Sequence, residues 1–206
     1  MAPFDASLAP GFGIEHLEPE HAASFIHHLR LHLADNGRDG LVYSLVDPRE
    51  LNGSMVETQR RVQSWTRCMQ RGVHQTEWRR VFVVRDLTLT PVQRRQRPDR
   101  GVVGHLDLRG GTMLAELHRC QLAMGLYRSC RGRGVGRCLL DAAVDWARQQ
   151  PSLVWMDLGV FSHNAAALHL YGSAGFREVG RVAERYEVLG QRIDDVQMTL
   201  RLRPSD

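Results

Sequence analysis

The stretch Arg131-Gly132-Arg133-Gly134-Val135-Gly136 separates an apolar run, Leu122 to Leu126, from a helical pattern that opens at Arg137-Cys138-Leu139-Leu140. Glycines there let the backbone turn tightly and approach a ligand without interference from a Cβ atom. The helix that follows supplies unpaired N–H groups and the positive end of its dipole. Such a strand–loop–helix site suits a phosphorylated ligand, to which the two arginines add charged donors. The alternative is an ordinary glycine-rich turn with solvated arginines.

The composition indicates a globular protein of one domain. The chain has 206 residues, of which 43% are hydrophobic and 24% charged, which is enough to bury a core. No apolar run approaches the roughly 20 residues that span a bilayer. Residues Met1 to Ile14 lack the basic-then-apolar layout of a secretory signal. We therefore expect a cytoplasmic protein with no membrane partner.

The charge pattern favours a small anionic ligand over nucleic acid. The net charge is +4, and all 27 basic residues are arginine, whose planar fork suits phosphate groups. These arginines are scattered among acidic residues instead of forming one stripe, which disfavours a nucleic-acid surface. A polyanionic cofactor explains the local excess of arginine from Arg128 to Arg137.

Neither the cysteines nor the histidines show a metal-ligand pattern. The four cysteines have no CxxC spacing, and apolar surroundings favour buried thiols over disulfides at Cys120 and Cys130. His28 and His32 stand at i,i+4 in a predicted helix that also holds His21 and His27, but no glutamate gives an HExxH layout. We therefore predict no metal. These histidines could instead orient an acidic substrate.

Apolar periodicity predicts a mixed α/β sheet in a single domain of residues 14–206, after a flexible lead of residues 1–13. An exposed hairpin loop is expected at residues 88–100, with a recruiting surface for an acidic partner as the alternative. Helices are predicted at residues 18–35, 54–70, 137–149 and 165–174. Strands are predicted at residues 14–17, 78–85, 102–109, 117–126, 153–160, 177–188 and 193–202.

Two motifs in this order resemble those of the GNAT superfamily of acetyl-CoA-dependent N-acyltransferases. The residues from Arg131 to Gly136 match its acyl-CoA signature, (Q/R)-x-x-G-x-(G/A). Asn164-Ala165-Ala166-Ala167-Leu168-His169-Leu170-Tyr171-Gly172-Ser173-Ala174-Gly175-Phe176 matches the second signature, and residues 194–200 resemble the last strand of the family. The resemblance implies a mostly antiparallel sheet with a splayed central strand pair, flanked by helices. It also implies an acetyl-CoA cosubstrate.

The resemblance also implies which residues hold the cosubstrate. Backbone N–H groups of the glycine-rich turn would bind the pyrophosphate, and Met124 and Leu126 would offer backbone groups to the pantetheine arm and the thioester. An N–H group aimed at the thioester oxygen would stabilise the developing oxyanion. Asn164 would contact the cofactor, cap the following helix, or do both. The implied cofactor-binding set is Met124, Leu126, Arg131, Gly132, Arg133, Gly134, Val135, Gly136, Asn164 and Ala167.

Tyr171 matches the tyrosine that in this family often protonates the departing CoA thiolate. The alternative is a half-buried aromatic side chain whose hydroxyl merely finds a partner. The general base is less clearly marked, because the predicted strand before the glycine turn has no acid at its centre. By strand alternation, Glu116, His118 and Cys120 share one face, which makes Glu116 and His118 the candidate bases. A structural histidine, or deprotonation through a water chain, are the alternatives.

These observations predict an acetyltransferase that moves an acetyl group directly to an amine of a small molecule or peptide. No cysteine has the context of an acyl-enzyme nucleophile, although Cys120 keeps a covalent route open. The alternatives are an acyl-CoA-binding module without turnover, favoured if neither Glu116 nor His118 faces the thioester, and an arginine-rich nucleic-acid binder. Pairing into a homodimer through the last strands is a further expectation from the resemblance.

Overall fold

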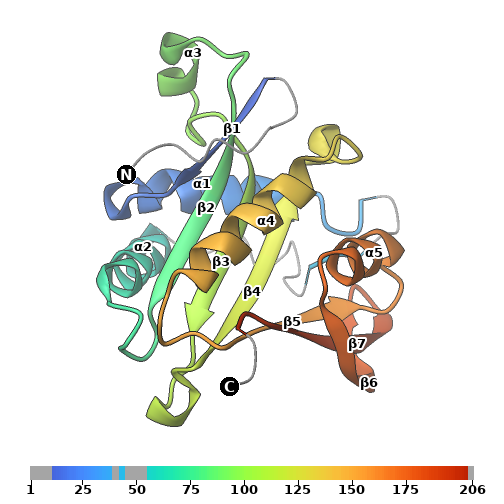
Figure 1. Ribbon diagram of the computed structural model, residues 1–206. Helices are drawn as coiled ribbons and strands as arrows, with labels where there is room; N and C mark the ends of the chain where they lie inside the picture. The colour runs from blue at the N-terminus through green and yellow to red at the C-terminus, as the bar shows by residue number, and fades with distance from the viewer. Residues whose placement is uncertain (1–10, 39–41, 45–54, 204–206) are drawn as a thin grey trace.

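One mixed sheet runs through the part of the chain that the computed structural model describes, residues 11–38, 42–44 and 55–203 (Figure 1). Its strand order is β1-β2-β3-β4-β5-β7-β6. The strands are β1 (Phe12–His16), β2 (Arg79–Asp86), β3 (Val102–Gly110), β4 (Arg119–Leu126), β5 (Trp155–Phe161), β6 (Arg177–Val188) and β7 (Gln191–Arg201). The α-helices are α1 (Ala22–Leu33), α2 (Met55–Gln70), α3 (Pro91–Gln96), α4 (Val135–Arg148) and α5 (Ala165–Ser173).

The predicted order of elements is confirmed, with three local differences. The loop predicted at residues 88–100 contains α3, which begins because Thr90 and Gln93 form a reciprocal capping box and Pro91 occupies the first helical position. β1 begins at Phe12, inside the stretch predicted as a flexible lead. β4 begins at Arg119, two residues later than predicted, because residues Leu114–Glu116 form a 3₁₀ turn before it.

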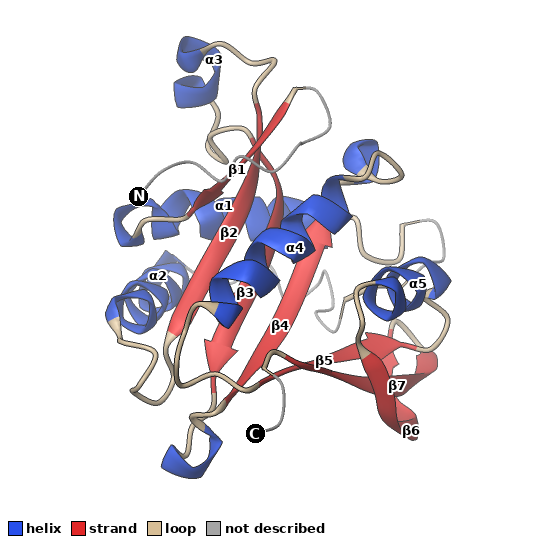
Figure 2. Cartoon of the chain, in the orientation of Figure 1, coloured by secondary structure: helices blue, strands red, loops and turns tan. Residues whose placement is uncertain are grey.

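All neighbouring strands pair antiparallel except β4 and β5, which are parallel and pair over only three positions, Arg119↔Trp155, Cys120↔Met156 and Gln121↔Asp157. Beyond Gln121 the two strands diverge (Figures 1 and 2). β4 meanwhile stays paired with β3 up to Leu126, and β5 stays paired with β7 up to Phe161. The predicted mixed, mostly antiparallel sheet with a splayed central pair is therefore confirmed.

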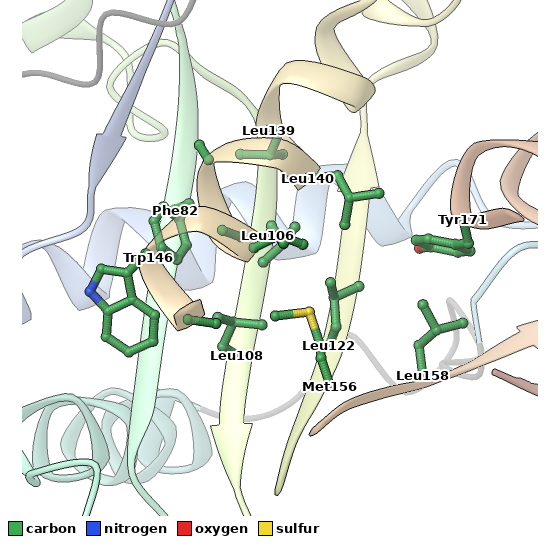
Figure 3. Close-up of a cluster of buried hydrophobic side chains, with 14 of the residues drawn as sticks. Phe82, Leu106, Leu108, Leu122, Leu139, Leu140, Trp146, Met156, Leu158 and Tyr171 are labelled. Carbon is green, nitrogen blue, oxygen red and sulfur yellow. The ribbon is translucent and has the colours of Figure 1, made fainter. Parts of the chain in front are cut away.

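Strand alternation sorts the side chains of β3 between the two faces of the sheet. Leu106 and Leu108 join the main core with Leu139, Leu140 and other residues of α4, which crosses one face of the sheet (Figures 1 and 3). The intervening side chains of His105, Asp107 and Arg109 therefore face the opposite side. That side is covered by α1 and α2, where a second core joins Phe25 and Met69 to the sheet. No helix in the described ranges is long and apolar enough to cross a membrane.

Candidate active site

A cavity of about 1030 Å³ lies at the divergence of β4 and β5. Its walls include residues 122–126 of β4, residues 157–161 of β5, the glycine-rich turn and the inner side of α5. On the other face of the sheet it reaches His32 of α1, together with His105 and Arg109 of β3. Ligand pockets usually measure about 300–1,000 Å³, so this cavity has room for a large ligand with a second molecule beside it.

The backbone of β4 faces the cavity with groups that none of the described strands pairs. The N–H group of Tyr127 donates to the carbonyl of Val103 at 2.9 Å, which fixes the phase of the β3–β4 ladder. Because alternate residues of a strand point to opposite edges, the N–H groups of Met124 and Leu126 point away from β3. β5 has already diverged there, so these donors face the gap. They are the backbone groups that sequence reasoning assigned to a pantetheine chain and a thioester.

The glycine-rich turn presents a concentration of free backbone donors. None of the N–H groups of residues 132–136 donates a hydrogen bond within the described chain. Gly132 and Gly134 have φ angles of +69° and +76°, the left-handed region that favours glycine. Gly134 is also the N-cap of α4, whose first turn holds no acidic residue, so the helix dipole adds to the attraction for anions. The turn thus presents free N–H groups at the position where the sequence predicts an anion cradle.

Arginines hold the turn in place on both sides. The Arg131 side chain donates from Nε to the carbonyl of Leu126 at 3.1 Å, and its guanidinium lies 4.9 Å from the centre of the Tyr43 ring. The guanidinium of Arg133 lies over the ring of Phe12 at 4.6 Å. These contacts leave part of each fork available for a phosphate group.

α5 contributes three of the predicted residues to the cavity wall. Asn164 caps the helix, because its Oδ1 accepts the Ala167 N–H at 3.1 Å. Its Nδ2 makes no hydrogen bond in the described chain and stays available to a ligand, so Asn164 can serve both of the roles considered for it. Ala167 and Tyr171 follow along the inner side of the helix.

The Tyr171 side chain points from α5 toward β4, above Leu158 of β5 (Figure 3). Only 6% of the residue is exposed, and its ring packs edge-on against Phe176. The hydroxyl makes no hydrogen bond with any described residue. Burial raises the pKa of Tyr171 above its ordinary value, so the hydroxyl stays protonated at neutral pH. The Tyr171 residue that lines the cavity is therefore in the protonated form that the predicted acid role requires.

Glu116 and His118, the two predicted bases, are not among the residues that line the cavity. Because β4 begins at Arg119, Glu116 belongs to the preceding 3₁₀ turn, where it accepts the Met113 N–H at 3.3 Å. His118 is exposed at the start of the strand, about 20 Å along β4 from Met124 at 3.3 Å per residue. The structure therefore does not bring either side chain to the gap.

Sequence reasoning missed the polar half of the cavity on the α1 face. His105 and Arg109 of β3 line it, together with Arg119 of β4, Asp157 of β5, Arg185 of β6 and Asp195 of β7. Asp157 accepts two hydrogen bonds from Arg119, each 2.7 Å long, and Asp195 pairs with Arg185 at 2.9 Å. The available signal was the polar alternation His105, Asp107, Arg109 within an otherwise apolar strand.

Burial changes the pKa of several titratable groups behind the cavity. It lowers the pKa of His28 to about 3, and the neighbouring His32 acts in the same direction. It lowers the pKa of His32 to about 4, and the neighbouring Arg131 acts in the same direction. It raises the pKa of Asp107 to about 6, against the opposing effect of Arg79. The site therefore holds neutral histidines at neutral pH.

Comparison with known proteins identifies the same fold elsewhere. A family model described as acetyltransferase (GNAT) family matches residues 60–176. A protein from Salmonella typhimurium, described as an acetyltransferase and solved with its cofactor acetyl-CoA, has a TM-score of 0.70 at 18% identity, over 95% of this chain and 96% of that one.

Two further solved structures have named acceptors. Spermidine N-acetyltransferase from Vibrio cholerae, in complex with CoA and spermine, has a TM-score of 0.65 at 20% identity, over 93% of this chain and 96% of that one. Ribosomal-protein-alanine N-acetyltransferase from Brucella melitensis has a TM-score of 0.64 at 21% identity, over 91% and 98% of the two chains. The similarity at this level of identity is one of fold.

The lowered pKa of His32 predicts a pH-dependent stability. Between pH 6.5 and about 4 the unfolded chain binds a proton at this position and the folded chain does not, so the free energy of unfolding falls as the pH falls. His32→Gln should therefore flatten the pH dependence by about 1 kcal/mol per pH unit in this window. Urea unfolding at pH 7, 6 and 5 measures the difference. His74→Gln, at an exposed histidine, is the control. The raised pKa of Asp107 makes the free energy of unfolding change with pH in the opposite direction, but Asp107 is present in the native protein and in both variants.

Proposed function

Since the chain belongs to the GNAT acetyltransferase family and is an N-acetyltransferase that uses acetyl-CoA, we propose that it transfers the acetyl group directly to an amine whose molecule also carries an anionic group. The observation that carries this proposal is the gap between β4 and β5, with free N–H groups along β4 and at its glycine-rich end. Donor and acceptor enter the gap from opposite faces of the sheet.

The donor half fits acetyl-CoA residue by residue. The N–H groups of residues 132–136 and the forks of Arg131 and Arg133 bind the pyrophosphate. The backbone of Met124 and Leu126 binds the pantetheine arm, as an added strand would. An N–H group of β4 then stabilises the negative charge that develops on the thioester oxygen. Asn164 Nδ2 and the methyl group of Ala167 complete the wall along α5.

The cysteines do not support a covalent acetyl-enzyme. Cys120 is buried and does not line the cavity, and its Sγ contacts the carbonyl of Trp155 at 3.7 Å. Burial raises the pKa of Cys120 to about 12, so its nucleophilic thiolate form is scarce. Transfer in one step, with the amine held against the thioester, needs no such nucleophile.

Charge on the acceptor half favours an anionic group next to the reacting amine. On this half the cavity is lined by three arginines (Arg109, Arg119 and Arg185) and two aspartates, and both aspartates are already paired with arginine. Arg109 is exposed, and among the described residues its guanidinium donates only to the neutral Gln121, at 3.2 and 2.9 Å. A carboxylate of an amino acid or peptide would pair with it. The solved relatives named for spermidine and for a ribosomal protein show that the fold itself admits different acceptors.

The glycine-rich turn gives the first test, because two glycines offer a matched pair. Gly134 and Gly190 have φ angles of +76° and +75°, and a Cβ added at either meets nothing within 4 Å. Gly134→Ala and Gly190→Ala should each lose about 1 kcal/mol of stability from left-handed strain. Only Gly134→Ala should weaken acetyl-CoA binding, measured as a smaller thermal shift with the cosubstrate. Equal shifts in both variants would place the pyrophosphate elsewhere.

Tyr171→Phe tests the proton donor. The phenyl ring keeps the packing on Phe176, so the melting temperature and the KM for acetyl-CoA should stay close to those of the native protein. The kcat should fall tenfold or more, the usual contribution of an acid–base group. Initial rates of CoA release, measured over a range of acetyl-CoA concentrations, give both the kcat and the KM. An unchanged kcat would assign Tyr171 to the core alone.

Arg109→Gln tests the nature of the acceptor. We expect the native enzyme to acetylate acidic amino acids and acidic dipeptides faster than spermidine, all at equal concentration, with free CoA measured by a thiol reagent. The variant should raise the KM of the acidic acceptors about tenfold or more, since it removes a charged hydrogen bond. Arg95→Gln on the exposed face of α3 is the control. A preference for spermidine would contradict the anionic acceptor and leave the donor site intact.

A further inference from the structure

Three buried histidines lie against the same segment of β4 that faces the thioester. His28 and His32 come from α1 and His105 from β3, and all three are buried. Ring centres of His28 and His105 are 5.1 Å apart, and those of His32 and His105 are 5.4 Å apart. A Cβ added at Gly125 would lie 2.4 Å from Nε2 of His32 and 2.9 Å from Cε1 of His105. Only glycine lets these rings approach the backbone between Met124 and Leu126.

Hydrogen bonds fix which nitrogen of each ring carries a proton. Nδ1 of His28 lies 3.1 Å from the carbonyl oxygen of Val102 and 3.1 Å from the Tyr127 hydroxyl. A carbonyl oxygen only accepts, so a proton on Nδ1 of His28 is required to avoid two facing lone pairs. In the neutral ring Nε2 is then an acceptor.

The same logic continues to His105. Nε2 of His28 lies 3.0 Å from Nδ1 of His105, which must therefore donate its proton to His28. The remaining nitrogen of His105, Nε2, is left with a free lone pair and has no hydrogen-bond partner among the described residues. His105 is one of the residues that line the cavity, so this nitrogen is a candidate proton acceptor beside it.

We propose that His105 is the catalytic base of the acetyl transfer, accepting through Nε2 the proton that the acceptor amine loses, and that His28 is a positioning residue that holds His105 in this tautomer. The inference rests on the proposed function. Neither residue lies in the two sequence motifs that match the family, and the histidine replaces the bases expected at Glu116 and His118.

The chemistry balances with the groups present. The lone pair of the neutral amine forms the N–C bond, the C–S bond breaks, and the sulfur leaves with its electron pair. The nitrogen carries a positive charge once it has bonded to the acetyl carbon, so its proton is acidic and passes to Nε2 of His105. The departing sulfur takes a proton from the Tyr171 hydroxyl. Exchange with water restores both side chains after the products leave.

The surroundings keep His105 neutral, as a base must be. Burial lowers the pKa of His105 well below its ordinary value, and the neighbouring His28 and His32 act in the same direction. The charged groups further out are Asp99, which Arg97 holds through two hydrogen bonds of 3.0 Å, and Arg131 beside His32. Asp107 and Arg109 flank it on β3. A weak base suffices here because the nitrogen is positively charged once it has bonded to the acetyl carbon, and its proton is then strongly acidic.

Nuclear magnetic resonance tests the tautomers without any acceptor. Long-range ¹H–¹⁵N spectra of the uniformly labelled full chain, recorded with CoA at pH 6 to 8, should show His28 and His105 neutral, each protonated on Nδ1. A proton on Nε2 of His105, or a charged ring at pH 7, would overturn the proposal. This measurement does not depend on whether the acceptor has been found.

Kinetics of variants test the roles, using the amine that the native enzyme acetylates fastest. His105→Gln should lower kcat about 100-fold or more while the thermal shift with acetyl-CoA persists. His28→Leu, which cannot accept from His105, should lower kcat at least tenfold, and His28→Gln should restore it because an amide both accepts and donates. His74→Gln is the matched control.

The outcomes separate the two proposals. An unchanged kcat in His105→Gln, with acetyl-CoA still bound, would contradict the assignment of His105 as the base. A fall in kcat seen only in His118→Gln would assign that role to His118. Equal losses in His28→Leu and His28→Gln would contradict the positioning role. If the native protein shows no thermal shift with acetyl-CoA and no transfer to any amine, the proposed function itself fails.

Discussion

The structure depends on a parallel strand pair that stops pairing after three residues. A sheet normally satisfies the backbone groups of its inner strands, and unpaired polar groups inside a protein are costly. From Leu122 and Leu158 onward, the facing backbone groups of β4 and β5 are not paired with each other. The divergence begins at a side-chain junction, where Arg119 of β4 and Thr199 of β7 both bond to Asp157 of β5. Above it, the ring of Tyr171 and the side chain of Leu158 lie beside the gap (Figure 3).

The gap separates two chemistries by face. On the α4 face, backbone N–H groups and a helix N-terminus make up the proposed phosphate site, which depends little on side-chain identity. On the α1 face, the wall is made of side chains: arginines, paired aspartates and neutral histidines. The proposed donor site is therefore encoded by glycines and strand pairing, whereas the proposed acceptor site is encoded by single residues spread over α1, β3, β4, β5, β6 and β7.

That difference explains how far the sequence could predict the structure. The turn from Arg131 to Gly136, Asn164 and Tyr171 stand in contiguous motifs, so their places on strand ends and helices could be read from local pattern. The histidine pair could not, because His28 and His105 are 77 residues apart and meet only through packing of α1 on β3. Glu116 and His118 were misplaced for a local reason, since the 3₁₀ turn at Leu114–Glu116 delays the strand and leaves both outside the cavity.

The width of the gap is set by the fold itself. The Arg119–Asp157–Thr199 junction and the packing of α5 on the sheet hold β4 and β5 at a fixed separation. The entropy of arranging the donor-binding groups is therefore lost during folding and not during association, which favours tight binding for a given contact area. Association with the donor then resembles insertion of a missing strand into a rigid frame, and its rate should be limited by diffusion and orientation more than by rearrangement of the protein.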